Sequence, residues 1–482
     1  MKVLLAIPPG IGESKYQISN FLNFSAPPLG LAYIAAVLEE AGYKNKVRIV
    51  DSRTVGITSE DLRQIIKRFS PDIFGLQVKT PNYYDAVEAS HIAKEEDVPY
   101  VVWGGHHATP MAEEVLTANE DVDLIFRGEA EYTFRDFVQA VDDGKDWTKI
   151  RGLSFRENGF VKHTANAPLI KDINELPFPA RHLLPMDKYR IFGSALPATT
   201  MITSRGCPYD CEFCAVTSFY GRAWRTRTPE NIVAEMREIR EKYKVKAIAF
   251  VDDLFFTSEK RVMKICKAIA DLRKSHDVYW GATVRADRGG LKMLTTMRKA
   301  GCRLIFCGVE SGDQEILDSV KKETHVDQIE KFFRNSKKAH LDTLASISFG
   351  FPGETQETIH KTIDWTINVL DPSLAIFTIS TPYPGTPFFD QMREQGKIKE
   401  YDFTKYNLFN PIVELNGITR DELKQEVKEC YKRFYLRPSK ILQNTIRELK
   451  YAMESYGLRQ FASNSKVFAK GIINMRVLAG AI

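Results

Sequence analysis

The sequence lacks several features that would place it in a common class of protein. No apolar run approaches the ~18 residues of a membrane-spanning helix, so we expect no transmembrane segment. The net charge is only +5 over 482 residues, which does not favour nucleic acid as a partner. Neither a G-x-G-x-x-G fingerprint nor a P-loop is present, which argues against a dinucleotide or ATP as the ligand. The apolar run after Met1 and Lys2 is shorter than a signal peptide requires and predicts a first strand.

Cysteine is also scarce, because the chain has only seven, three of which are clustered. This usage is typical of a reducing compartment rather than of a disulfide-stabilised protein, so we expect the cytoplasm. The four cysteines outside the cluster are irregularly spaced and predict buried core thiols: Cys266, Cys302, Cys307 and Cys430.

The clustered cysteines, Cys207, Cys211 and Cys214, have the spacing C-x₃-C-x₂-C. They follow a short apolar strand pattern that Gly206 and Pro208 end, so we expect the thiols on a loop at the strand's C-terminal end. Three thiolates on one loop suit an iron–sulfur cluster, which normally takes four ligands, so one iron would stay open. The alternatives are a zinc knuckle with a distant fourth ligand, or a disulfide with a spare thiol.

Residues 1–140 alternate strand and helix patterns, as a doubly wound, Rossmann- or flavodoxin-like parallel sheet does. Such sheets bind ligands beyond the carboxyl ends of their strands. Those ends supply our candidate ligand contacts, which are Pro8, Thr80, Tyr83, Gly104, Gly105, His106, Gly128 and Glu129.

The remainder of the chain divides into three segments. Residues 141–195 predict a connector that contains a hairpin and a proline-punctuated linker. Residues 196–396 show six strand–helix units and predict a partial (βα)6 TIM barrel, whose chemistry would lie at the C-terminal ends of its strands. Residues 397–482 predict amphipathic helices that either pack on the barrel or cap its active site.

The predicted barrel strands end in residues with distinctive chemistry. The candidates there are Asp252, Asp253, Arg285, Glu310, Ser311, Gly353 and Tyr383. A basic stretch of Arg222, Arg225 and Arg227 follows the cysteine loop. It either serves SAM or substrate or, as is more common, forms a solvated charged face.

The cysteine loop, with aromatic Phe213 before its last cysteine, resembles the signature of the radical S-adenosylmethionine (SAM) superfamily. The resemblance implies that the three cysteines hold a [4Fe–4S] cluster whose open iron chelates SAM, which one electron cleaves to a 5′-deoxyadenosyl radical. The family's usual G-G-E is replaced by Asp252 and Asp253, so an aspartate would hold the SAM amino group. The remaining candidates would bind the SAM carboxylate, ribose and adenosine or face the barrel mouth: Arg285, Glu310 with Ser311, Gly353, and Tyr383.

The N-terminal segment, with its G-G-x-H turn and later G-E, resembles the cobalamin-binding domain that precedes many radical SAM domains. It lacks the D-x-H-x-x-G motif that supplies a cobalt-ligating histidine, so the resemblance implies base-off cobalamin without that ligand. Tyr83, Tyr84 and His106 are the candidates for the lower cobalt face. The alternative is a flavodoxin-like module for another nucleotide or for no ligand.

Together the resemblances imply a cobalamin-dependent radical SAM C-methyltransferase. An unactivated sp³ carbon has no lone pair to attack a sulfonium methyl, so it must become a radical and take its methyl group from methylcobalamin. The substrate is either a protein, such as the glutamine of methyl-coenzyme M reductase, or a small molecule such as a hopanoid. The other possibilities are a non-methylating porphyrin cyclase or lipid-coupling enzyme, and a non-catalytic regulatory protein. A protein that donates single electrons is an expected partner.

Overall fold

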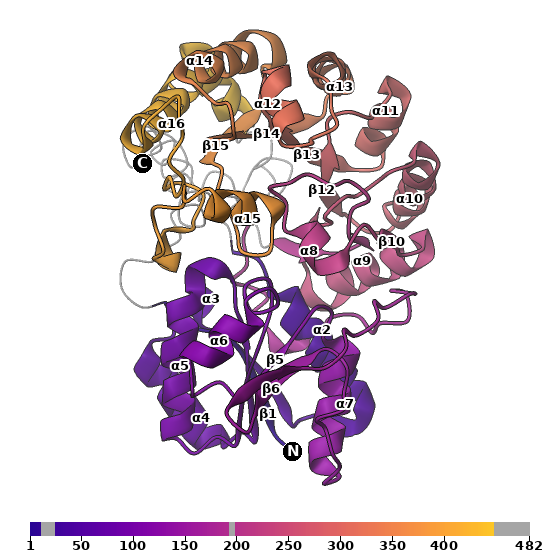
Figure 1. Ribbon diagram of the computed structural model, residues 1–482. Coiled ribbons are helices and arrows are strands. Elements are labelled where there is room, and N and C mark those ends of the chain that lie inside the picture. Colours follow the sequence, from indigo (N-terminus) through magenta and orange to yellow (C-terminus); the bar gives the residue numbers. More distant parts are fainter. Residues whose placement is uncertain (11–24, 192–197, 448–482) are drawn as a thin grey trace.

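Two α/β modules follow each other along the chain, a seven-stranded sheet first and a six-stranded sheet second (Figure 1). The computed structural model describes residues 1–10, 25–191 and 198–447. None of the helices in these ranges is long and apolar enough to cross a membrane. The predicted final segment lies outside the described residues from position 448 onward.

The N-terminal sheet has the strand order β2-β1-β3-β4-β5-β6-β7, in which the first five strands are parallel. These five are β1 Val3–Ile7, β2 Val47–Asp51, β3 Ile73–Gln77, β4 Tyr100–Gly104 and β5 Leu124–Phe126. Successive side chains of a strand point to opposite faces, and here both faces are buried, because Leu4 and Leu5 belong to separate apolar cores.

Helices cover both faces of this sheet (Figure 1). One core includes side chains of α2 Leu29–Leu38 and α7 Glu131–Asp142. The opposite core includes side chains of α4 Ser59–Phe69, α5 Tyr83–Glu95 and α6 Ala112–Ala118. A single turn, α3 Ser52–Val55, follows β2. The doubly wound fold expected from the sequence is confirmed.

A hairpin of β6 Leu153–Glu157 and β7 Phe160–His163 extends the same sheet. It is antiparallel, and β6 pairs with β5, for example Leu124 with Phe155. The hairpin that we assigned to the connector is therefore hydrogen-bonded to the N-terminal sheet.

The second sheet has the order β15-β14-β13-β12-β11-β8, all parallel and in chain order. Its strands are β8 Ala198–Met201, β11 Ala247–Phe250, β12 Tyr279–Arg285, β13 Cys302–Glu310, β14 Asp342–Phe349 and β15 Leu374–Ile379. The helices that alternate with them are α9 Pro229–Tyr243, α10 Glu259–Leu272, α11 Leu291–Lys299, α12 Gln314–Ser319, α13 Val326–Lys338 and α14 Gln356–Trp365. The predicted six-stranded partial barrel is confirmed.

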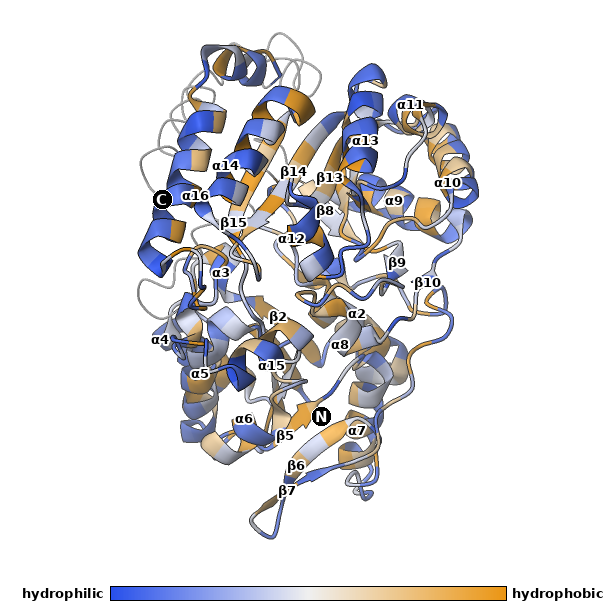
Figure 2. Cartoon of the chain, turned by 45° about the horizontal axis from the view of Figure 1, so that its top comes forward, coloured by the Kyte–Doolittle hydropathy of each residue, from blue (hydrophilic) through white to orange (hydrophobic). Residues whose placement is uncertain are grey.

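The barrel helices are amphipathic, with hydrophobic residues on one side and hydrophilic residues on the other (Figure 2). In α13 the buried side includes Ile329, Phe332 and Phe333. The core of this module also contains Cys266, Cys302, Cys307 and Cys430, all buried and free, as expected for core thiols.

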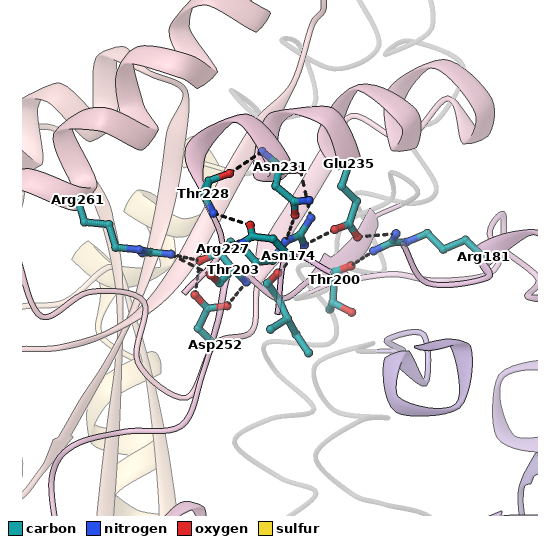
Figure 3. A network of polar contacts seen from close by, with 11 residues as sticks. Asn174, Arg181, Thr200, Thr203, Arg227, Thr228, Asn231, Glu235, Asp252 and Arg261 are labelled. Carbon is teal, nitrogen blue, oxygen red and sulfur yellow. Dashed lines mark hydrogen bonds and ion pairs between the residues drawn. The ribbon is translucent and has the colours of Figure 1, made fainter. Parts of the chain in front are cut away.

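The connector is fastened to the barrel by a buried ion-pair network (Figure 3). Glu235 of α9 is fully buried and lies 2.6 Å from the guanidinium of Arg181, which belongs to the connector. Arg227 forms an ion pair with the other oxygen of Glu235 and donates to the carbonyl of Ile202. Two guanidinium groups therefore neutralise one carboxylate between the connector and the cysteine-bearing end of the barrel.

The described part of the C-terminal segment covers the last barrel strand and reaches the first module. Helix α16 Arg420–Tyr435 packs on β15, where the Tyr431 hydroxyl accepts a hydrogen bond from the amide of Phe377. The short turn η5 Phe403–Lys405 instead contacts the N-terminal module, because the ring of Phe403 lies 5.3 Å from that of Tyr83.

Candidate functional site

A cavity of about 1470 Å³ lies between the two modules. Its walls include Gly104, His106 and Gly128 from the carboxyl ends of the N-terminal strands, and Arg205 and Asp253 from the barrel. Pockets for drug-sized ligands measure roughly 300–1,000 Å³, so this cavity has room for a bulky cofactor. It lies where an open parallel sheet binds ligands, beyond the carboxyl edge of its strands.

Two glycines allow the backbone itself to form part of the cavity wall. Gly105 has φ +110°, and a Cβ there would lie 2.7 Å from the carbonyl oxygen of Val78. Gly128 has φ +76°, and a Cβ there would meet no atom within 4 Å. The backbone conformation disfavours a side chain at both positions. At Gly105 a side chain would collide with the Val78 peptide, whereas at Gly128 its absence leaves open space where a flat ligand can approach the main chain. The N-terminal wall therefore fits a large planar cofactor such as cobalamin.

His106 opens onto this cavity, and its ring stacks on that of Phe219, with ring centroids 4.7 Å apart. Desolvation within the cavity and the nearby Lys79 lower the pKa of His106 to about 4. The imidazole is therefore neutral near pH 7 and keeps a nitrogen lone pair free for a metal or a hydrogen bond.

Three of the predicted cofactor contacts in this module do not line the cavity. Thr80 hydrogen-bonds His107, with 3.2 Å between the hydroxyl and the ring nitrogen Nδ1. Tyr83 starts α5, and its ring packs edge-on against Trp103, while its hydroxyl accepts from Asn119. Pro8 is buried beside the end of β1. Strand-end position alone does not decide whether a side chain faces the cavity or packs beneath it.

Glu129 lines the cavity, but its carboxylate is engaged by the barrel. Arg205 Nη1 lies 2.7 Å from one oxygen, and Arg225 Nη1 lies 2.6 Å from the other. Burial alone would raise the pKa of Glu129, but the two guanidinium groups hold it below its usual range. The sequence assigned Arg225 to a solvated face, and the structure instead pairs it with a buried acid.

The cysteine loop lies between two short paired strands, β9 Ser204–Arg205 and β10 Arg225–Thr226. It carries the three clustered cysteines, all free, and the short helix α8 Val216–Tyr220. Gly206 starts the loop at φ +82°, and a Cβ there would lie 2.0 Å from the carbonyl oxygen of Ala223. This contact closes the loop at its base and requires glycine.

The three thiols lie in a partly desolvated environment. Burial raises the pKa of Cys207, and it raises the pKa of Cys214 to about 12. In the described part of the chain, no three His, Cys, Asp or Glu side chains are grouped closely enough to hold one metal ion. A cluster that binds each thiolate to a different iron does not need such convergence, and metal binding displaces the thiol protons.

The cationic side chain of Arg285 lies beside the cysteine loop. Arg285 Nη1 lies 3.7 Å from Cys211 Sγ, and its guanidinium stacks on Tyr209, 3.7 Å from the ring centroid. The same guanidinium donates to the carbonyl of Glu323 and to the hydroxyl of Thr324. Positive charge and N–H donors near cluster sulfurs stabilise an electron on the cluster.

The aspartates at the end of β11 occupy different positions. Asp252 is buried and accepts hydrogen bonds from the Thr203 amide, at 2.6 Å, and from the Ser204 hydroxyl, at 2.9 Å. Asp253 lines the cavity and accepts from the amide of Gly206, at the start of the cysteine loop. Asp252 thus supports the loop from below, whereas Asp253 is open to a ligand.

Other barrel candidates are held by protein partners. Glu310 has φ +67°, and its carboxylate lies 2.6 Å from the ammonium group of buried Lys322. Ser311 is buried against Thr362, with 3.2 Å between the hydroxyls. Gly353 lies in the turn after β14 at φ +87°. Tyr383 packs in an apolar cluster, and its hydroxyl donates to the carbonyl of Tyr406.

Comparison with known proteins follows the same division of the chain. Residues 22–138 match the B12 binding domain family, and residues 201–366 match the Radical SAM superfamily. An uncharacterized methyltransferase of Pyrococcus horikoshii, PH0819, is 34% identical over 446 residues, covering 92% of this chain and 94% of the relative. The chain belongs to the cobalamin-dependent radical SAM methyltransferase family.

Other relatives extend the comparison. The anaerobic magnesium-protoporphyrin IX monomethyl ester cyclase of Cereibacter sphaeroides is 30% identical, covering 86% of this chain and 68% of the cyclase. Among solved structures, the radical SAM methyltransferase TsrM of Kitasatospora setae, with cobalamin and a [4Fe–4S] cluster, has TM-score 0.72 at 16% identity, covering 100% of both chains. The cobalamin-dependent enzyme OxsB, with aqua-cobalamin and SAM, has TM-score 0.70 at 19% identity, covering 99% of this chain and 72% of OxsB.

The cofactors expected from the sequence are confirmed for this family: a [4Fe–4S] cluster, SAM and cobalamin. The residues that bind them stay a prediction. Sequence reasoning missed Arg205 and Lys79, which both line the cavity. The position of Arg205, directly before the glycine that opens the cysteine loop, was an available signal.

Proposed function

We propose that this protein is a C-methyltransferase that removes a hydrogen atom from an unactivated sp³ carbon and places a methyl group there. One observation carries the proposal: a single cavity is lined by strand ends of the cobalamin module and by residues beside the cysteine loop. A radical formed near the barrel can therefore meet a methyl donor without crossing bulk water.

The roles that we propose for the residues follow from their positions. Cys207, Cys211 and Cys214 hold the cluster, and Asp253 accepts from the amino group of SAM. Arg285, expected from the sequence to bind the SAM carboxylate, instead stabilises the cluster in our proposal. One of its N–H groups faces Cys211 Sγ, and others donate to the Glu323 carbonyl and the Thr324 hydroxyl. The wall of Gly105 and Gly128 receives the corrin, and neutral His106 is the candidate for the cobalt face.

The cofactors would supply a hydrogen-abstracting 5′-deoxyadenosyl radical from one SAM and a methyl group from methylcobalamin, which a second SAM replenishes. Two electrons are therefore consumed for each methyl group, which implies a protein that donates single electrons. Such chemistry requires a reducing environment, and all seven cysteines are free, so we infer a cytoplasmic location.

The experiment uses anaerobically reconstituted enzyme, reductant and SAM whose methyl group is deuterated. Candidate substrates are a peptide with the glutamine region of methyl-coenzyme M reductase, and small molecules such as hopanoids. We propose the protein side chain first, because a partial barrel beside a cavity of about 1470 Å³ can admit a peptide loop. A trideuteromethyl group on carbon, with equal yields of 5′-deoxyadenosine and S-adenosylhomocysteine, supports methyl transfer.

A non-methylating cyclase is the second candidate, favoured by the 30% identity to the magnesium-protoporphyrin IX monomethyl ester cyclase. It predicts 5′-deoxyadenosine without S-adenosylhomocysteine or any labelled product. Conversion of that porphyrin ester without methyl transfer would reject our first proposal. A protein that forms no 5′-deoxyadenosine at all would reject both.

A further inference from the structure

Glu129 joins the two modules through the buried ion pairs of its carboxylate. It follows Gly128 at the cavity wall, and its side chain is only 2% exposed. Besides its ion pairs with Arg205 and Arg225, it accepts a hydrogen bond from the amide of Ile170 at 2.9 Å. Nearby Glu131 pairs with the second terminal nitrogen of Arg205 at 2.6 Å.

The two arginines form the base of the cysteine loop. Arg205 and Arg225 are direct partners in the antiparallel pair of β9 and β10, so their charges face each other across that ribbon. Like charges placed opposite each other destabilise a strand pair unless a counter-charge lies between them. Glu129 supplies that charge, and Cys207 is only two residues beyond Arg205.

A ligand bound at the cavity wall is therefore connected to the cluster loop through the Glu129 side chain and its two arginine partners. The segment that contains Gly128 and Glu129 connects β5 with α7, and Gly128 faces open space in the cavity. When a bound ligand displaces this segment, Glu129 moves with it. Glu129 forms ion pairs with Arg205 of β9 and Arg225 of β10, the two strands at the base of the loop. Buried, charge-assisted contacts are short and directional, so they transmit such a shift rather than absorb it.

We propose that Glu129 is a positioning residue that couples cobalamin occupancy to the geometry of the cluster loop, and thereby to the affinity for SAM. The proposal rests on the family's two cofactor sites and is independent of which substrate is methylated. Coupling between two sites is reciprocal and typically changes affinity about 5- to 150-fold.

The test measures SAM binding to the full-length, cluster-reconstituted chain, with and without hydroxocobalamin, by anaerobic calorimetry. The electron paramagnetic resonance spectrum of the reduced cluster with SAM gives a second readout. We expect cobalamin to change the SAM dissociation constant of the wild-type protein by a factor in that range and to shift the spectrum. In Glu129→Gln, which keeps the shape but removes the charge, the factor falls toward one while both cofactors still bind.

A matched control separates coupling from general destabilisation. Glu235→Gln also removes a buried carboxylate held by two arginines, but these are Arg181 of the connector and Arg227 after β10. The change therefore acts on the cysteine-bearing end of the barrel while leaving the ion pairs of Glu129 in place. We expect cobalamin to change the SAM dissociation constant of this control by the same factor as in the wild type. Arg205→Lys keeps the charge but loses the fork to Glu129 and Glu131, so it should also lower the factor, even if Glu129→Gln does not fold.

Three outcomes would overturn the proposal. The first is a wild-type protein in which cobalamin leaves both the SAM affinity and the spectrum unchanged. The second is a Glu129→Gln or Arg205→Lys protein in which cobalamin still changes the SAM affinity by the full wild-type factor. The two cofactors would then influence each other directly across the cavity, without Glu129. The third is an equal loss of coupling in the Glu235→Gln control.

Discussion

Alanine substitutions at Gly105 and Gly128 test whether the cavity wall is shaped for a cofactor or for the fold. Both glycines have positive φ and line the cavity. They differ in what a new methyl group would meet: the carbonyl oxygen of Val78 at 2.7 Å for Gly105, and open space for Gly128. The Val78 peptide cannot easily retreat, because its oxygen accepts from His107 and its amide donates to Gly104.

The two changes should therefore cost different amounts of folding free energy. A left-handed backbone conformation costs an alanine roughly 1–2 kcal/mol, which is our expected loss for Gly128→Ala. Gly105→Ala adds an overpacked contact worth about 1–3 kcal/mol, so we expect a loss of about 2–5 kcal/mol. For cobalamin the expectation differs, because the methyl group of Gly128→Ala enters space that the cofactor would use.

The assay combines urea unfolding of the cobalamin-free proteins with cobalamin titration followed by absorbance. We expect the stability order wild type, Gly128→Ala, Gly105→Ala, and weaker cobalamin binding in Gly128→Ala despite its nearly intact fold. Equal stability of the two variants would refute the close-packing argument at Gly105. Wild-type cobalamin affinity in Gly128→Ala would show that the corrin does not use this wall.

Two further predictions concern stability. Burial raises the pKa of Glu354 to about 7, so the folded state holds a proton that the unfolded state has released above about pH 4.5. The contribution of Glu354 to stability should therefore be largest below about pH 4.5 and fall by about 3 kcal/mol between roughly pH 4.5 and 7. Urea midpoints of the wild type and of Glu354→Gln at several pH values isolate this contribution, and an unchanged slope in Glu354→Gln would contradict it. Phe403→Ala removes a ring that packs on Tyr83 and His107, so module docking should weaken by about 1–3 kcal/mol. Limited proteolysis should then cut between the modules faster than in the matched change Phe160→Ala, whose ring is 79% exposed, and equal cutting rates would exclude a docking role for Phe403.

The sequence was most informative where the signal is local. The cysteine spacing marked the loop, and strand–helix alternation predicted both sheets, because hydrophobic periodicity reflects which faces are buried. It was least informative about side-chain direction. Tyr83 begins α5 beside the cavity, but its ring packs against Phe403, 320 residues later in the chain, and it does not line the cavity.

Non-local partners also explain the other differences. Arg225 looked like a surface charge because its partner, Glu129, lies 96 residues earlier. The hairpin strand β6 was predicted as a strand, but only the folded sheet shows that it pairs with β5. Turn signals define a hairpin locally, whereas the edge that receives it depends on the whole sheet.

The most direct test of the account is metal and product analysis of anaerobically purified and reconstituted protein. We predict about four irons per chain and one cobalamin, with 5′-deoxyadenosine released when the reduced protein meets SAM. Cys211→Ala should lose the iron and the 5′-deoxyadenosine but keep the cobalamin. Zinc in place of iron in the cysteine loop, or an N-terminal module that does not retain cobalamin, would contradict the account.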